Sequence, residues 1–145
     1  TVLSRGLGDV YKRQTPYGYT DWVASMSPEI AYGRDGEGDF ALITSEYVDD
    51  GKDAFVVKVY LDSGKSKMAT PKEQANFTSI VYQDGVAIAI DRKSGKAYLL
   101  DVDTMQFTDA LEIVDPSASN AGLATNYNGS ALVGVKNGLV RVTPV

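Results

Sequence analysis

Three stretches of the chain decide its fold, DFALI at 39–43, GVAIAI at 85–90 and SALVGV at 130–135. Each is an apolar run of strand length, and one alanine of each run, Ala41, Ala87 or Ala131, aligns with those of the other two. Taking that alanine as the anchor, the runs are 46 and 44 residues apart. Because strands rich in Val, Ile and Phe separated by turn residues are typical of β-structure, we read the three runs as copies of one strand in a repeated unit.

The neighbouring segments repeat with the anchors. A short strand with an aromatic residue near its end precedes each anchor, at 30–32, 80–82 and 123–127. A further strand follows each anchor, and we align the segments VKV, LDV and VRV at 57–59, 100–102 and 140–142. An outer strand is expected at 66–70 and at 107–113, and the third unit ends before an equivalent one. Each unit therefore has about four strands.

Turn signals separate the expected strands. Asp-Gly and Asn-Gly pairs at 35–36, 84–85, 128–129 and 137–138 supply the positive φ angles that tight hairpins require. No segment shows sustained helical periodicity, and the longest apolar runs are far shorter than the ~20 residues of a membrane-spanning helix. The sequence predicts an all-β fold with no transmembrane segment.

A period of 40–46 residues with four strands is the period of propeller blades, which number 4–8 in closed rings. We therefore predict about three four-stranded antiparallel blades of an incomplete β-propeller. The predicted units are about 28–71, 75–115 and 119–145, and the missing blades are expected elsewhere in the same chain. A stand-alone β-sandwich is the alternative fold. The predicted core is Ala41, Ile43, Val57, Val59, Ile80, Ala87, Ile88, Leu100, Val102, Leu132, Val133 and Val140.

The first fourteen residues are set apart from this repeat. Ser4–Gln14, SRGLGDVYKRQ, resembles the translation of a transposase sequencing adaptor over eleven consecutive residues. We interpret 1–14 as a non-native segment and 15–145 as the propeller fragment. The native start of the protein and any export signal are then expected upstream. Without 1–14 the chain has 11 basic and 18 acidic residues, and this acidity disfavours nucleic acid as a partner.

The pattern of strand and turn residues in Tyr60–Lys67 and Tyr98–Thr104 resembles that of bacterial propellers of the surface-layer (YVTN-type) and quinoprotein-like class. The first of these segments contains the Asp-x-Gly-Lys turn at 62–65. The resemblance covers roughly 30–142. It implies a bacterial protein that is exported, periplasmic or on the cell surface. The only tryptophan, Trp22, lies outside the repeats, which counts against a quinone cofactor.

The chain has neither cysteine nor histidine, which excludes thiol nucleophiles, Ser-His-Asp triads and the usual zinc sites. We predict no catalytic residue and no cofactor within the fragment. The expected function is a non-catalytic scaffold or binding module for a glycan or protein partner. The alternative is that these are blades of a propeller dehydrogenase, lyase or glycosidase whose active site lies outside the fragment.

Acidic and aromatic clusters remain as site candidates. Asp35, Glu37 and Asp39 alternate in a glycine-rich loop, as oxygen ligands do at the start of a calcium loop, although the remaining ligands of an EF-hand are missing and a solvated hairpin turn is the favoured interpretation. A second acidic loop contains 49–53. Asp101 and Asp103 alternate in a predicted strand, where Asp103 is expected to start the next turn. The aromatic cluster at 17–22 is a candidate sugar-stacking surface or ordinary strand packing.

Overall fold

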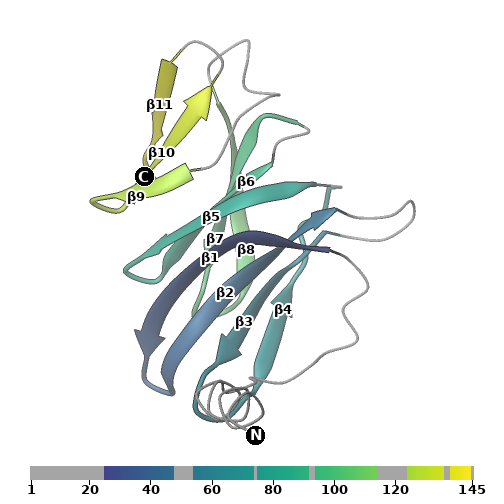
Figure 1. The fold of residues 1–145 in the computed structure, drawn as a ribbon, viewed down its shortest axis with the longest axis vertical. Coiled ribbons are helices and arrows are strands. Elements are labelled where there is room, and N and C mark those ends of the chain that lie inside the picture. The colour runs from purple at the N-terminus through teal and green to yellow at the C-terminus, as the bar shows by residue number, and fades with distance from the viewer. Residues whose placement is uncertain are drawn as a thin grey trace, which may run out of the picture.

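The fold is all-β, as the sequence predicts, in the computed structural model of the chain. The structure describes residues 25–47, 54–73, 75–91, 94–113, 124–135 and 138–144. None of these residues lies in an α-helix, so the described part of the chain contributes no helical membrane span. The described strands form three separate antiparallel sheets, drawn from three successive parts of the chain (Figure 1).

Sheet 1 consists of β1 (Ser25–Asp35), β2 (Gly38–Tyr47), β3 (Val56–Tyr60) and β4 (Ser66–Ala69) in that order. Sheet 2 repeats this meander with β5 (Phe77–Gln83), β6 (Val86–Asp91), β7 (Lys96–Asp101) and β8 (Gln106–Glu112). Sheet 3 has the three strands β9 (Ala124–Tyr127), β10 (Ser130–Val135) and β11 (Gly138–Val142), with β10 in the centre.

Two hairpins have the turns that the sequence predicts. Gln83 pairs with Val86 and Tyr127 pairs with Ser130, so that the two-residue turns are Asp84-Gly85 and Asn128-Gly129. All four turn residues have positive φ, the conformation that Asp-Gly and Asn-Gly pairs adopt most readily in hairpins. The turn of the first hairpin lies one residue later than the predicted 35–36, because Asp35 pairs with Gly38 and the turn residues are 36–37.

The three anchor alanines occupy equivalent register positions. Ala41 pairs with Tyr32 and Val59, Ala87 with Tyr82 and Leu100, and Ala131 with Asn126 and Val142. Successive side chains of a strand point to opposite faces, so each sheet has a back face that carries the anchor alanine. We call the opposite face the front face, and it carries Leu42, Ile88 and Leu132.

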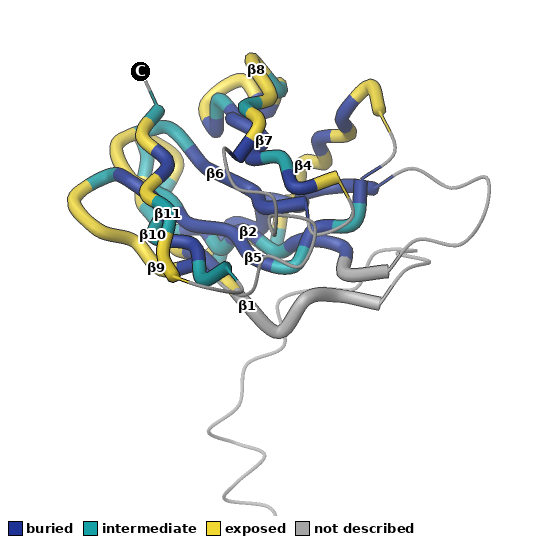
Figure 2. Tube along the Cα trace, turned by 90° about the horizontal axis from the view of Figure 1, so that it is seen from above, coloured by how far each residue is buried: buried dark blue, intermediate teal, exposed yellow. Residues whose placement is uncertain are grey.

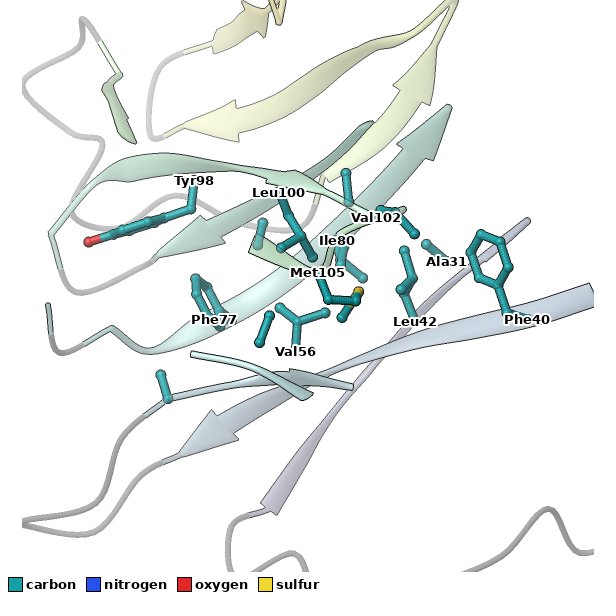
Figure 3. Packing of buried hydrophobic residues seen from close by; sticks show 14 of the residues in the cluster. Ala31, Phe40, Leu42, Val56, Phe77, Ile80, Tyr98, Leu100, Val102 and Met105 are labelled. Carbon is teal, nitrogen blue, oxygen red and sulfur yellow. The ribbon is translucent and has the colours of Figure 1, made fainter. Parts of the chain in front are cut away.

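The front face of one sheet packs on the back face of the next. The largest buried cluster joins front-face residues of sheet 1, such as Phe40, Leu42 and Val56, with back-face residues of sheet 2, such as Ala87 and Leu100 (Figure 3). A second cluster joins the front face of sheet 2, including Ile88 and Ile90, with Ala131 and Val133 on the back face of sheet 3. Sheet 2 is therefore covered on both faces.

The burial of the strands follows from this stacking. Figure 2 shows buried residues along β6, whose residues 87–91 are all fully buried, and exposed residues along the outer strand β8. Residues on the outward faces of the end sheets are more open. Of the predicted core, eight residues are buried, whereas Ala41, Ile43, Leu132 and Val140 are only half-buried, which corrects that prediction. Ala41 and Ile43 lie on the back face of sheet 1 and Leu132 on the front face of sheet 3, where no described sheet covers them, and Val140 borders the second cluster.

The first strands of the three sheets lie next to one another. β1 contacts β5, and β5 contacts β9, so three segments about 45 residues apart in sequence run along one inner edge of the molecule (Figure 1). Hydrogen bonds join β5 to β9. Ser79 Oγ accepts from Ala124 N at 2.9 Å, and Asn126 Nδ2 donates to the Tyr82 carbonyl at 2.9 Å. This edge positions the candidate site.

Candidate functional site

A groove of about 230 Å³ follows the inner edge formed by β1, β5 and β9. Each strand contributes three consecutive residues to the groove, and the three triplets occupy equivalent register positions. The lining residues are Ile30, Ala31, Tyr32, Ile80, Val81, Tyr82, Ala124, Thr125 and Asn126. The volume is below the roughly 300–1,000 Å³ of sites for drug-sized ligands, so the groove suits a small ligand or part of a longer one.

The polar groups of the groove are neutral. The nine lining residues include two tyrosines, one threonine and one asparagine, and no Asp, Glu, Lys or Arg. Tyr32, Thr125 and Asn126 are exposed. Aromatic rings with hydroxyl and amide groups can stack on a flat apolar face and hydrogen-bond to hydroxyl groups beside it.

Several of these side chains are held in place by the neighbouring sheet. The Tyr82 ring meets the Phe40 ring edge-on at 5.3 Å, and its hydroxyl accepts a hydrogen bond from Gly85 N at 3.1 Å. Asn126 Oδ1 accepts from Gly129 N at 3.2 Å while its amide group donates to Tyr82. The floor of the groove is therefore preorganised, a property that lowers the entropic cost of binding.

A second polar cluster lies where sheet 1 meets sheet 2. Lys58, whose side chain is 1% exposed, donates from Nζ to Asp35 Oδ2 at 2.6 Å and to the Val102 carbonyl of sheet 2 at 3.1 Å. Its ammonium group also lies over the Phe40 ring, 4.5 Å from the centroid. The Tyr60 hydroxyl donates to the same oxygen of Asp35 at 2.7 Å. The buried charge is thus paired and hydrogen-bonded, as a buried lysine requires.

This cluster shifts the pKa values of its members. Burial alone would raise the pKa of Asp35, but hydrogen bonds from Lys58, Tyr60 and the Glu37 amide outweigh it and lower the pKa to about 2. Burial would lower the pKa of Lys58, and its bonds to Asp35 and Tyr60 more than reverse this effect and raise it. Burial and the bond to Asp35 raise the pKa of Tyr60. Asp35 and Lys58 therefore carry opposite charges at neutral pH.

We expect the fold to lose stability in acid through Asp35. A carboxyl group with a lowered folded-state pKa stabilises the fold above its ordinary pKa, and this contribution is lost as the pH falls from 3.8 to about 2. The loss should reach about 2 kcal/mol. Urea unfolding at a series of pH values measures it. In Asp35→Asn the difference from the unmodified protein should disappear toward pH 2, and a difference that stays constant with pH would contradict the assignment.

Two of the three predicted calcium ligands, Asp35 and Asp39, are held by other partners. Asp35 accepts from Lys58, Tyr60 and the Glu37 amide, the last at 2.8 Å, and Asp39 pairs with the exposed Arg34 Nε at 2.8 Å. Among the described residues no three acidic side chains come together as a metal site would need. Calcium binding by Asp35, Glu37 and Asp39 stays a prediction, and a bound ion would compete with Lys58 for Asp35.

The remaining candidate residues from the sequence lie either around the turn after β7 or outside the described residues. Asp101 ends β7, and its Oδ1 accepts from the amides of Asp103 and Thr104, so Asp101 rather than Asp103 holds the turn, which corrects the prediction. Asp103 lies in that turn and not in a strand. The acidic loop 49–53 and the aromatic cluster 17–22 lie outside the described residues, as does the segment 1–14.

Sequence reasoning missed Lys58. The alignment of VKV with LDV placed Lys58, Asp101 and Arg141 in one position of the repeat. The register instead matches Lys58, opposite Leu42, with Leu99, opposite Ile88, and with Arg141, opposite Leu132. Lys58 is thus a front-face residue aimed at the next sheet, and no local signal links it to Asp35, which lies 23 residues earlier.

No known protein family and no curated protein matches this chain. Among solved structures it is similar to the computationally designed Ika4 protein, with 12% identity and a TM-score of 0.46 over 89% of this chain and 99% of Ika4. It is also similar to apo AztD from Citrobacter koseri, with 10% identity and a TM-score of 0.46 over 81% of this chain. The chain spans 43% of the length of AztD. The surface-layer resemblance stays a prediction.

Proposed function

We propose that the three sheets are consecutive blades of a β-propeller that acts as a non-catalytic binding module. The observation that carries this proposal is the groove, because three equivalent strands from three repeated sheets line one continuous site. Binding sites in β-folds built from repeated sheets form where loops or inner strands of several units converge. Export to the bacterial periplasm or cell surface belongs to the same proposal and rests on the surface-layer resemblance.

The ligand that suits the groove best is a neutral glycan. The site has no ionisable acid or base other than tyrosine, so it offers nothing to pair with a charged ligand. Tyr32 and Ile30 at the sheet 1 end of the groove suit the apolar face of one sugar ring, and Thr125 and Asn126 at the sheet 3 end suit the hydroxyl groups of another, so a ligand that uses both ends is an oligosaccharide. A polypeptide segment with small uncharged side chains is the other ligand that such a surface favours.

NMR titration with a panel of neutral oligosaccharides tests this function. We expect amide shifts confined to residues of β1, β5 and β9 that line the groove. Thr125→Ala should weaken binding by roughly fivefold, because it removes one hydrogen bond worth about 1 kcal/mol. Thr108→Ala is the matched control, since Thr108 is an exposed threonine on the outer strand β8.

Shifts that map to loops away from the inner strands, or equal losses of affinity in the two threonine variants, would contradict a glycan site in the groove. The absence of shifts with every neutral sugar would also contradict it.

A further inference from the structure

The middle of the groove contains Tyr82, whose side chain is held at two points. The Tyr82 ring meets the Phe40 ring edge-on, and the Tyr82 hydroxyl accepts a hydrogen bond from Gly85 N at 3.1 Å. The Tyr82 carbonyl also accepts from Asn126 Nδ2 of sheet 3 at 2.9 Å. Tyr82 therefore shapes the middle of the groove and anchors a lining residue at its sheet 3 end.

Two routes lead from these contacts to the ammonium group of Lys58. The first runs through Phe40, because Lys58 Nζ lies 4.5 Å from the centroid of the Phe40 ring. The second runs through the backbone of sheet 2. Lys58 Nζ donates to the Val102 carbonyl at 3.1 Å, and the Val102 amide donates to the Gly85 carbonyl at 2.9 Å. Since Gly85 N in turn holds the Tyr82 hydroxyl, the two routes meet at Tyr82 and close a ring of contacts.

Lys58 itself does not reach the groove, because its side chain is 1% exposed and it is not among the residues that line the groove. The equivalent front-face position of sheet 2 is filled by Leu99, which is also buried. An apolar side chain therefore suits the stacking of the sheets, and a buried ion pair is often no more stabilising than apolar residues of similar volume. The charge of Lys58 indicates a role beyond the contact between the sheets.

We propose that Lys58 is a positioning residue of the groove, whose ammonium group holds the Tyr82 ring in the orientation that a ligand meets. Without this group, the Phe40 ring and the turn at Gly85 each lose a contact that fixes them, and the Tyr82 ring gains freedom to move. A ligand must then order that ring at an entropic cost, which lowers its affinity. The effect on affinity rests on the proposed function, whereas the position of the ring is a property of the free protein.

The α-protons of Gly33 report the position of the Tyr82 ring without any ligand. A Cβ atom built on Gly33 would lie 2.3 Å from Tyr82 Cε1, so the α-proton in that place lies against the ring. The ring current of Tyr82 should therefore displace the NMR resonance of this proton from its ordinary position. In Lys58→Met we expect most of this displacement to be lost, because the ring no longer keeps one orientation.

The panel of neutral oligosaccharides that tests the groove also measures the effect on affinity. Lys58→Met should weaken their binding by roughly three- to tenfold, the cost of ordering one further side chain on binding. The double variant Asp35→Asn/Lys58→Met removes the ammonium group without leaving a buried unpaired carboxylate. It should show the same loss at the Gly33 resonance and the same loss of affinity, and it tests the proposal even if Lys58→Met fails to fold.

Val57→Ala is the matched control, because it lowers the stability of the same strand from the opposite face. Val57 precedes Lys58 in β3 and is buried on the back face of sheet 1 with Phe55 and Val59. The substitution removes none of the Lys58 contacts, so the Gly33 resonance and the affinity should stay as in the unmodified protein. Measuring at a temperature where circular dichroism shows every variant to be folded separates a loss of position from a loss of stability.

A Gly33 resonance that is the same in the unmodified protein and in both Lys58 variants would overturn the proposal, whether or not any sugar binds. A changed resonance with unchanged affinity for a sugar that binds would also overturn it, since the position of Tyr82 would then not matter to the site. So would equal changes in Val57→Ala. If no sugar binds the unmodified protein, the proposed function is contradicted, and the Gly33 resonance still decides whether Lys58 positions Tyr82.

Discussion

Replacing Lys58 by methionine is expected to lower the free energy of unfolding by about 3 kcal/mol, near the lower end of the range for breaking a buried ion pair. Methionine keeps much of the aliphatic side chain but removes the ammonium group. The Asp35 carboxylate then loses the charged one of its three donors, the Val102 carbonyl loses its bond from Lys58, and Phe40 loses the cation above its ring. Urea unfolding at pH 7 measures the change.

Lys96→Met is the control for this prediction. Lys96 also pairs with a carboxylate, that of Glu73 at 3.3 Å, but the two side chains are 27% and 65% exposed. An exposed pair of this kind contributes about 0–1 kcal/mol. If Lys58→Met and Lys96→Met cost the same, the Lys58 cluster does not stabilise the contact between the sheets.

Adding one methyl group at Gly33 is expected to destabilise the fold by about 1–3 kcal/mol, the usual cost of overpacking a well-packed contact. A Cβ atom at this position would lie 2.3 Å from Tyr82 Cε1 and 2.7 Å from Phe40 Cζ. Both rings are fixed by their contact with each other, so neither can move without loss. Differential scanning calorimetry of Gly33→Ala measures the shift.

Gly134→Ala is the matched control, because Gly134 also lies in a strand but a Cβ atom there would meet no atom within 4 Å. It should be neutral, or stabilising by up to about 1 kcal/mol through the loss of unfolded-state entropy. A Gly33→Ala protein as stable as Gly134→Ala would show that Tyr82 does not lie over Gly33.

The sequence predicts the strands, two of the hairpin turns and the equivalence of the three anchor alanines. Two alignments within the repeat are wrong for different physical reasons. Matching VKV with LDV shifts the third strand of sheet 2 by two residues. Such a shift leaves every side chain on the same face, so the alternation of inward and outward residues cannot reveal it. Matching Tyr127 with Tyr32 and Tyr82 shifts a strand by one residue and moves Tyr127 to the opposite face, since Asn126 occupies the equivalent position.

The groove could not be predicted from the sequence. The groove depends on β1, β5 and β9 lying side by side, and no local pattern states which strand of each unit faces its counterparts. The core prediction likewise missed Phe40, Leu42 and Phe77, which are fully buried. It placed Ala41 and Ile43 of the back face of sheet 1 in the core, whereas both are half-buried and the packing of sheet 1 on sheet 2 buries the front face.

A double-mutant cycle between Gly33 and Tyr82 measures most directly whether front face packs on back face. If the next sheet places Tyr82 over Gly33, the cost of Gly33→Ala should fall by at least half when Tyr82 is already replaced by alanine, since the methyl group then enters vacated space. The same cost in both backgrounds would mean that the two positions do not meet, and the stacking of the sheets described above would be wrong.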